Sequence, residues 1–298
     1  MATLASVIDD YLDDCRARGL SLKTVEDNYG YALRERFLPW CSENGVDALE
    51  GVDTKLMTRW QADLLTKPGR RGKPISRFSS DGWIKAVNKF LKWAHEQGEI
   101  EQLAHGPGIK KPKPKLDPPS RQEIDRMESR AQTERDKLIV RLLADTGIRA
   151  SELLALRPSD LIERDRQYHL RIAHGKGDKE RWVPVPRLAP RIRRFLVDGD
   201  GGQIFTGLRK RAGENRPLTL SGLQKMIRSL AREAGVSKKV HPHAFRHAYT
   251  SWALAGGMSA IQVANILGHD GLHMIQRHYS HLSSRDAYEA QQRLYASS

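Results

Sequence analysis

HPHAFRHAYTSW, residues 241–252, places three histidines and one arginine within seven residues. Pro242 fits the first turn of a helix, where no backbone N–H donor is needed, so we expect a helix to begin there. Side chains three and four positions apart lie on one face of a helix. One face then carries aromatic side chains suited to a core: Phe245, Tyr249 and Trp252. The other carries polar side chains that point to a cleft or to solvent: His243, Arg246, His247 and Thr250.

Three environments suit this polar face. It could be a solvated basic surface, or His243 and His247 could both ligate one zinc ion, because they are four residues apart. Against zinc, Arg246 would place a positive charge beside the ion, and the Glu of an H-E-x-x-H motif is missing. Arginine and histidine together on a rigid helix instead favour an anionic oxygen pair, such as that of a phosphate. We therefore expect no metal.

A second arginine lies in ADTGIRASELLAL, residues 144–156. Gly147 is typical of a helix end, and Arg149 follows it just before a short helix. Glu152 lies three residues after Arg149 and can brace its guanidinium. The segment could hold only a structural ion pair, or it could present Arg149 as a second phosphate contact.

Two further segments carry reactive side chains. In HGKGDKERWVPV, residues 174–185, Lys176 lies between two glycines at the expected tip of a hairpin. It could be a solvated lysine or a proton donor. In ILGHDGLHMIQRHYSHL, residues 266–282, His269 follows a helix-ending glycine and Tyr279 comes ten residues later.

The hydrophobic pattern divides the chain into three parts. Residues 1–103 show four stretches with helical periodicity, the third from about Thr54 and the fourth from about Ser80, and predict a helical domain. Residues 104–119 hold five prolines and four lysines, which predicts an extended basic linker. Residues 120–298 predict helices and one β-hairpin. The expected fold class is mainly α with a small antiparallel β-sheet.

Local signals mark several helix ends in the last part. Ser120 with Glu123 forms a capping box, and the apolar periodicity that follows stops at Thr146–Gly147. Two more Ser-x-x-Gln pairs predict helix starts at Ser221 and Ser259. Alternation from Tyr168 to Ile172, with 182–185, predicts the hairpin.

The charge distribution indicates a polyanionic partner. The formal net charge is +14, and residues 1–100 hold 15 basic and 15 acidic residues, so the surplus lies in residues 101–298. A loop and the linker concentrate cations that could contact DNA phosphates or simply be solvated: Lys67, Arg70, Arg71, Lys73, Arg77, Lys110, Lys111, Lys113 and Lys115.

The sequence lacks the features expected of a membrane protein or of a secreted, disulfide-rich protein. No apolar run approaches the roughly 20 residues that span a bilayer, and Asp9 and Asp10 interrupt the start. Two cysteines, Cys15 and Cys41, are too few for a disulfide framework. We expect a cytoplasmic, nucleoid-associated protein with no membrane contact.

Taken in order, the four motifs TGIRASELLAL, GKGDKERWVPV, HPHAFRH and LGH with HYSHL resemble those of the tyrosine recombinases, the phage integrase family. The resemblance implies a four-helix, SAM-like core-binding domain followed by an α+β catalytic domain. It implies an enzyme that cleaves and rejoins DNA through a covalent 3′-phosphotyrosyl intermediate, without cofactor. The implied catalytic residues are Arg149, Lys176, His243, Arg246, His269 and Tyr279.

The implied partners are a double-stranded DNA recombination site, a tetramer on two duplexes with a dimer at each site, and accessory DNA-bending proteins. One spacing departs from the commonest family pattern, because the tyrosine follows the LGH histidine by ten residues instead of nine. Tyr288 and Tyr295 are therefore alternatives for the nucleophile, and Lys179 is one for Lys176. A type IB topoisomerase, a DNA-binding factor with a degenerate catalytic domain and a metal-dependent phosphodiesterase are the alternative functions.

Overall fold

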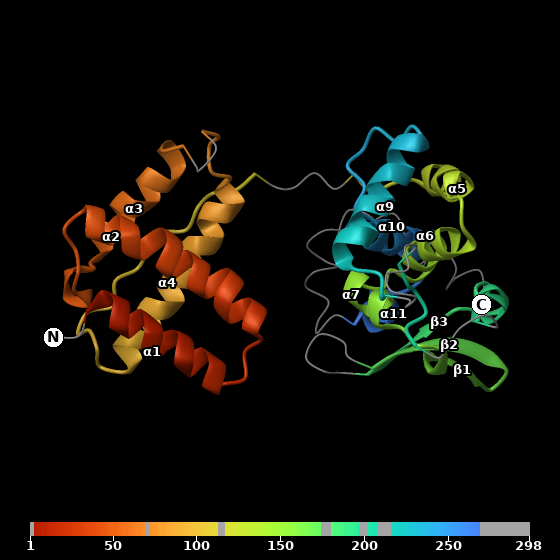
Figure 1. Cartoon of the computed structure of the whole chain (residues 1–298), viewed down its shortest axis with the longest axis horizontal. Helices are drawn as coiled ribbons and strands as arrows, with labels where there is room; N and C mark the ends of the chain where they lie inside the picture. Colours follow the sequence, from red (N-terminus) through yellow and green to blue (C-terminus); the bar gives the residue numbers. More distant parts are fainter. Residues whose placement is uncertain are drawn as a thin grey trace, which may run out of the picture. The chain divides into compact units, whose positions relative to one another are not determined.

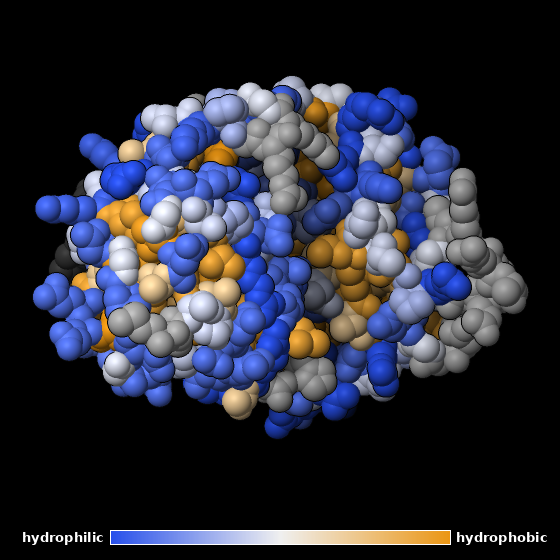
Figure 2. All heavy atoms as spheres, turned by 60° about the vertical axis from the view of Figure 1, so that its left-hand side comes forward, coloured by the Kyte–Doolittle hydropathy of each residue, from blue (hydrophilic) through white to orange (hydrophobic). Residues whose placement is uncertain are grey.

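The computed structural model describes residues 3–68, 72–112, 117–173, 180–196, 202–207 and 216–268. The chain divides into two compact units, Met1–Pro114 and Lys115–Ser298 (Figure 1). The division falls within the predicted linker, and each unit has its own hydrophobic core. On the face seen in Figure 2, hydrophilic side chains cover most of the surface, with hydrophobic patches between them. Within the ranges described, no helix combines the length and apolar character needed to cross a membrane.

The first unit is helical (Figure 1). Its elements are α1 (Leu4–Ala17), the π-helical η1 (Lys23–Gly30) and η2 (Leu33–Phe37), α2 (Leu38–Glu43), the 3-10 turn η3 (Leu49–Gly51), α3 (Thr54–Thr66) and α4 (Arg77–Glu96). The sequence predicted a start near Ser80, but α4 begins three residues earlier. The Ser76 hydroxyl accepts a hydrogen bond from the Ser79 amide, so the helix begins at Arg77. Ala104 and Ile109, at the beginning of the predicted linker, are buried in this unit's core.

The second unit combines helices with one sheet. Its helical elements are α5 (Arg121–Arg130), α6 (Glu134–Thr146), α7 (Ala150–Ala155), η4 (Pro158–Asp160), α8 (Ala189–Leu196), α9 (Leu220–Glu233), α10 (Pro242–Ala255) and α11 (Ala260–Leu267). The predicted capping boxes at Ser120 and Ser259 are confirmed. The predicted start at Ser221 is wrong, because the Thr219 side chain accepts from the Gly222 amide and begins α9 two residues earlier.

The sheet is antiparallel with strand order β1-β2-β3, formed by Leu161–Arg164, Gln167–Ile172 and Arg181–Pro184. The predicted hairpin is β2 with β3, in which buried Leu170 faces buried Val183 across the strands. Strand β1 was not predicted. Asp165 and Arg166 join it to β2 in left-handed conformations, with φ of 51° and 60°, where the usual sequence signal is Asn-Gly. The described chain is mainly helical with a small antiparallel sheet, as the sequence predicted.

Helix ends and packing bring the motifs of the second unit together. Helix α10 packs against α6, and α11 packs against β3. Gly147 ends α6 with φ +62°, and Gly268 ends α11 with φ +64°. Both glycines adopt the left-handed conformation that lets the chain turn at once after a helix. The turn after α6 and the turn after α11 therefore meet beside the first turns of α10.

Candidate active site

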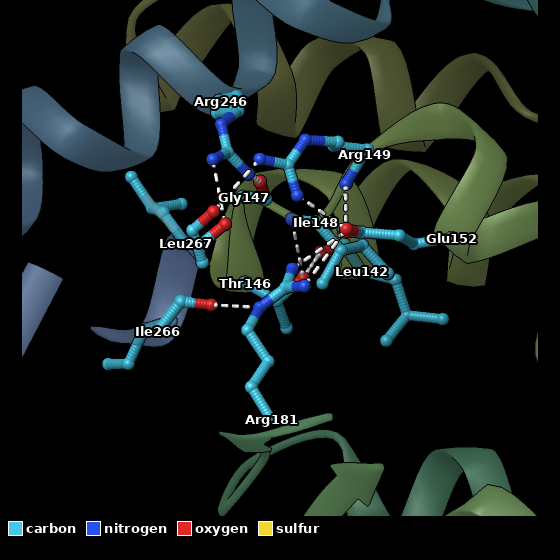
Figure 3. A network of polar contacts seen from close by, with 11 residues as sticks. Leu142, Thr146, Gly147, Ile148, Arg149, Glu152, Arg181, Arg246, Ile266 and Leu267 are labelled. Atoms are coloured by element: carbon cyan, nitrogen blue, oxygen red, sulfur yellow. Dashed lines mark hydrogen bonds and ion pairs between the residues drawn. The ribbon is translucent and has the colours of Figure 1, made fainter. Parts of the chain in front are cut away.

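Arg149 and Arg246 converge on the turn that ends α11 (Figure 3). Arg149 immediately precedes α7, and Arg246 lies near the start of α10. Arg246 Nη2 donates a 2.7 Å hydrogen bond to the Leu267 carbonyl, and Arg149 Nη2 donates a 3.0 Å bond to the next carbonyl, that of Gly268. Two permanently charged guanidiniums beside each other form a site suited to anionic oxygens.

The turn after α6 supports Arg246 from a second direction. Arg246 Nη1 donates to the Gly147 carbonyl at 3.0 Å, and the residue is only 4 % exposed. A Cβ atom added to Gly147 would lie 2.8 Å from both Leu267 Cδ2 and Tyr249 Cδ1. A larger residue does not fit here without movement of those side chains, so glycine both permits the turn and admits the close packing that places its carbonyl.

A buried carboxylate supports Arg149. Glu152 accepts hydrogen bonds from the Arg149 amide at 2.8 Å and from Arg149 Nη1 at 2.6 Å, which confirms the predicted brace. Burial alone would raise the pKa of Glu152, but hydrogen bonds and charge from Arg181 and Arg149 outweigh it and lower the pKa to about 2. Glu152 is therefore ionised at neutral pH and holds Arg149 firmly.

His243 lies on α10 beside these arginines, with part of its surface open to solvent and part covered by the surrounding protein. Desolvation by the surrounding protein lowers its pKa below the usual value, and the charges of Arg246, His241 and Arg149 lower it further. Its ring contacts that of His247 edge to face, with centroids 4.6 Å apart. At neutral pH the lowered pKa leaves His243 uncharged and able to accept a proton.

The two predicted faces of α10 are only partly as expected. Phe245 is fully buried in the core, whereas Tyr249 and Trp252 are partly buried. Thr250 was expected to point to a cleft or to solvent, but it is 3 % exposed and donates a hydrogen bond to the Arg246 carbonyl of its own helix. Among the residues described, no group of three or more His, Cys, Asp or Glu side chains could hold a metal ion.

The remaining predicted catalytic residues, Lys176, His269 and Tyr279, lie outside the described residues, as do Lys179, Tyr288 and Tyr295. Of the predicted DNA contacts, Arg70, Arg71, Lys113 and Lys115 also lie outside them. The cations that the structure describes differ in their exposure and in whether a carboxylate pairs with them.

Lys73, Arg77 and Lys110 are exposed, and Arg77 donates to the Lys110 carbonyl at 3.4 Å. Lys67 is exposed and forms an ion pair with Asp63 at 2.7 Å. Lys111 is half-buried and bonded to the buried carboxylate of Asp81, so its charge already has a partner within the first unit.

Two features of the site were not predicted from the sequence. Arg181, the first residue of β3, donates to Glu152 with both terminal nitrogens. The carbonyls that hold the arginines also went unpredicted, because backbone atoms leave no mark in residue identity. Arg181 stands in the quoted motif GKGDKERWVPV, but nothing local in the sequence indicates its pairing with Glu152, which lies 29 residues earlier.

A helical unit is followed by an α+β unit in which two arginines meet on one turn, and their paired charges suit an anionic group such as a phosphodiester. A sequence profile described as "Phage integrase family" matches residues 120–285. The chain belongs to the phage integrase family, and the predicted resemblance is confirmed. It is a tyrosine recombinase, in a class of enzymes that cleave and rejoin DNA strands.

Curated relatives agree with this assignment, and solved structures share the fold. Tyrosine recombinase XerC of Shewanella sp. strain ANA-3 is 30% identical over 276 residues, which cover 87% of this chain and 85% of the relative. Tyrosine recombinase XerD of Oceanobacillus iheyensis is 32% identical over 243 residues, covering 76% and 78%. Among structures, the Tn1549 transposon integrase in complex with a circular intermediate DNA has a TM-score of 0.73 at 17% identity and covers 99% of this chain and 100% of its own. A λ integrase dimer bound to a core site has a TM-score of 0.71 at 18% identity, covering 92% and 97%. These two structures share the fold.

Proposed function

We propose that this chain is a site-specific DNA recombinase whose catalytic residues are Arg149, Lys176, His243, Arg246, His269 and Tyr279. The observation that carries the proposal is the convergence of Arg149 and Arg246 on the α11 turn, where His269 is the next residue in sequence. Each role follows from the chemistry of the side chain and from the family to which the chain belongs.

The two arginines neutralise the charge that repels a nucleophile from a phosphodiester. As the Tyr279 oxygen adds to phosphorus, negative charge grows on the nonbridging oxygens, and fixed guanidiniums stabilise it by directed, charge-assisted bonds. This charge stabilisation takes the part that a divalent ion plays in other phosphotransferases, so we propose that no metal is required.

Proton transfers complete the step. A tyrosine hydroxyl has an ordinary pKa of about 10, so it needs a proton acceptor and nearby cations to react as the phenolate. Neutral His243 beside Arg246 supplies the acceptor. The bond between phosphorus and the 5′ oxygen breaks as Lys176 donates a proton to that oxygen, and the 3′-phosphate is left joined to the Tyr279 oxygen. A 5′-hydroxyl from another strand reverses the step without ATP.

We further propose that the substrate is a double-stranded recombination site bound by a dimer, with two such duplexes joined in a tetramer and accessory DNA-bending proteins as possible participants. The λ integrase structure named above is a dimer on its core site, which supports the dimer. Exposed Lys73, Arg77 and Lys110 in the first unit would contact DNA phosphates together with the undescribed basic residues of the loop and linker. Cytoplasmic placement on the nucleoid follows from that substrate.

Covalent trapping tests the proposal. A suicide DNA substrate, nicked so that the freed 5′ fragment diffuses away, should leave wild-type protein attached to DNA after denaturation, with EDTA present. Tyr279→Phe should bind the same DNA and form no adduct. An adduct formed by Tyr279→Phe would refute the nucleophile assignment, and an adduct that forms only when a divalent ion is supplied would refute the metal-free mechanism.

A further inference from the structure

The guanidinium of Arg181 lies between Glu152 and the Ile266 carbonyl in the polar network (Figure 3). Its side chain is 9 % exposed. Nη1 and Nη2 donate to the two oxygens of Glu152 at 2.9 and 2.7 Å, and Nε donates to the Ile266 carbonyl at 2.7 Å. A paired, fork-like contact of this kind fixes the carboxylate in one orientation.

Glu152, held in this orientation, in turn fixes the position of Arg149. The same two carboxylate oxygens accept the Arg149 amide and Arg149 Nη1, so one buried side chain binds both arginines. With Arg181 removed, the carboxylate would lose two of its four described hydrogen bonds and would be held in place less firmly. Arg149 would then lose the fixed partner that aims its guanidinium.

Arg181 also fixes the turn that holds both arginines. It donates to Ile266, and the carbonyls of the next two residues, Leu267 and Gly268, accept from Arg246 and Arg149. A Cβ atom at Gly268 would lie 3.0 Å from Arg181 Cδ, so the chain passes directly against this side chain. One residue thus contacts the supports of both arginines.

The charge of Arg181 serves the site as well. Arg149 with Glu152 alone would be a neutral pair and would attract a phosphate only weakly. Arg181 returns one positive charge, so the group of Arg149, Arg181, Arg246 and Glu152 carries three guanidiniums against one carboxylate, a net charge of +2. Low exposure keeps that charge poorly screened by salt.

We propose that Arg181 is a positioning residue for DNA cleavage, one that aims Arg149 through Glu152 and anchors the α11 turn without touching the DNA. The proposal rests on the proposed function, because it assigns Arg149 to the scissile phosphate. It adds a residue of β3 to the machinery of the reaction.

The test compares Arg181→Met and Arg181→Lys with wild type in single-turnover formation of the covalent adduct at saturating DNA. Arg181→Met should lower the rate constant roughly 10- to 100-fold, as a small misplacement of a reacting or clamping group does. DNA affinity should fall much less than the rate constant, because Arg181 would make no DNA contact and its charge is one of many that attract the DNA. Arg181→Lys, which keeps the charge but loses the fork, should recover part of the rate.

Arg135→Met is the matched control. Arg135 is likewise a buried arginine that binds one carboxylate, Asp136, at 2.6 and 2.8 Å and one carbonyl, Thr206 O, at 2.5 Å. Its loss should lower the unfolding midpoint about as much as the loss of Arg181 and leave the rate of the folded protein unchanged. Equal rate losses in Arg135→Met and Arg181→Met would overturn the proposal, since the effect would then be general destabilisation.

A substrate with sulfur in place of the bridging 5′ oxygen separates two routes of action. The thiolate leaves without a proton. A loss of rate caused by the absence of Lys176 therefore disappears on this substrate, whereas a loss of rate caused by the absence of Arg149 remains. The Arg181→Met defect should remain, and its disappearance would overturn the proposal by showing that Arg181 acts through the β2–β3 connection. If wild type forms no adduct, the proposed function fails; if wild type and Arg181→Met react equally fast, this inference alone fails.

Discussion

Substitution of Gly147 by alanine should damage both the stability of the second unit and the site. Gly147 has φ +62°, and a residue with a Cβ atom pays about 1–2 kcal/mol in that conformation. The new methyl group would also lie 2.8 Å from Leu267 Cδ2 and from Tyr249 Cδ1, and overpacking of this kind costs about 1–3 kcal/mol. The free energy of unfolding should therefore fall by about 2–5 kcal/mol.

Gly235→Ala is the matched control for the strain alone. Gly235 follows α9 with φ +66°, and an added Cβ there meets no atom within 4 Å. Its substitution should cost only about 1–2 kcal/mol. The difference between the two variants then isolates the packing contribution, because both positions share the left-handed backbone and the same unit of the chain.

Urea unfolding of the full chain, followed by circular dichroism and compared at one temperature, measures both costs. Covalent adduct formation measures the second consequence, because the Gly147 carbonyl accepts from Arg246 and a shifted turn misdirects that guanidinium. Without urea, at a temperature where both variants are folded, Gly147→Ala should slow adduct formation and Gly235→Ala should not. Equal losses of stability in the two variants, with equal cleavage rates, would refute the packing argument.

Three further predictions concern titrating and buried charges. The pKa of Glu152 is lowered to about 2 from its ordinary 4.5, so its ion pairs stabilise the fold above pH 4.5 and are lost as the pH falls toward 2; acid unfolding of wild type should show this dependence and Glu152→Gln should lack it. Because the pKa of His243 is lowered, its neutral form predominates down to a pH below 6.5, so the adduct-formation rate should fall only in more acidic solution, and a His243→Gln variant that retains this acidic limb would contradict the proton-acceptor role. Asp81 is buried and binds both Lys85 and Lys111, so Asp81→Ala should destabilise the first unit by about 1–3 kcal/mol in thermal unfolding, whereas Asp63→Ala, which removes a more exposed carboxylate, should cost less.

Sequence periodicity predicted the helices well where a cap and an apolar face agree. The capping boxes at Ser120 and Ser259 each combine a hydroxyl residue with a partner three positions on, and both begin helices as expected. The start of α9 was misplaced because Ser221 with Gln224 imitates that pattern, while Thr219 lies two residues earlier and makes the actual hydrogen bond. A pattern of residue types cannot distinguish between two hydroxyl residues, two positions apart, that both fit the start of a helix.

The site was predictable to the extent that its chemistry lies in side chains. Arg149, Glu152, His243 and Arg246 carried recognisable chemistry and spacing, and the structure brings the two arginines together. Arg181 was passed over because its partners are distant in sequence: Glu152 precedes it by 29 residues and Ile266 follows by 85. No local spacing rule relates such residues, so the contact appears only once β3, α7 and α11 are packed.

The carbonyl supports explain why two helix-ending glycines lie beside the arginines. Carbonyl groups at the end of a helix have no partner within the helix and carry partial negative charge. Gly147 and Leu267 offer such carbonyls to Arg246, and Gly268 offers one to Arg149. A carboxylate in each place would orient the guanidiniums equally well but would cancel their charge, whereas a carbonyl dipole orients them and leaves the full positive charge for an incoming phosphate. The left-handed glycines turn the chain so that these carbonyls face the arginines, which makes the backbone at Gly147 and Gly268 as much a part of the proposed phosphate site as the side chains it holds.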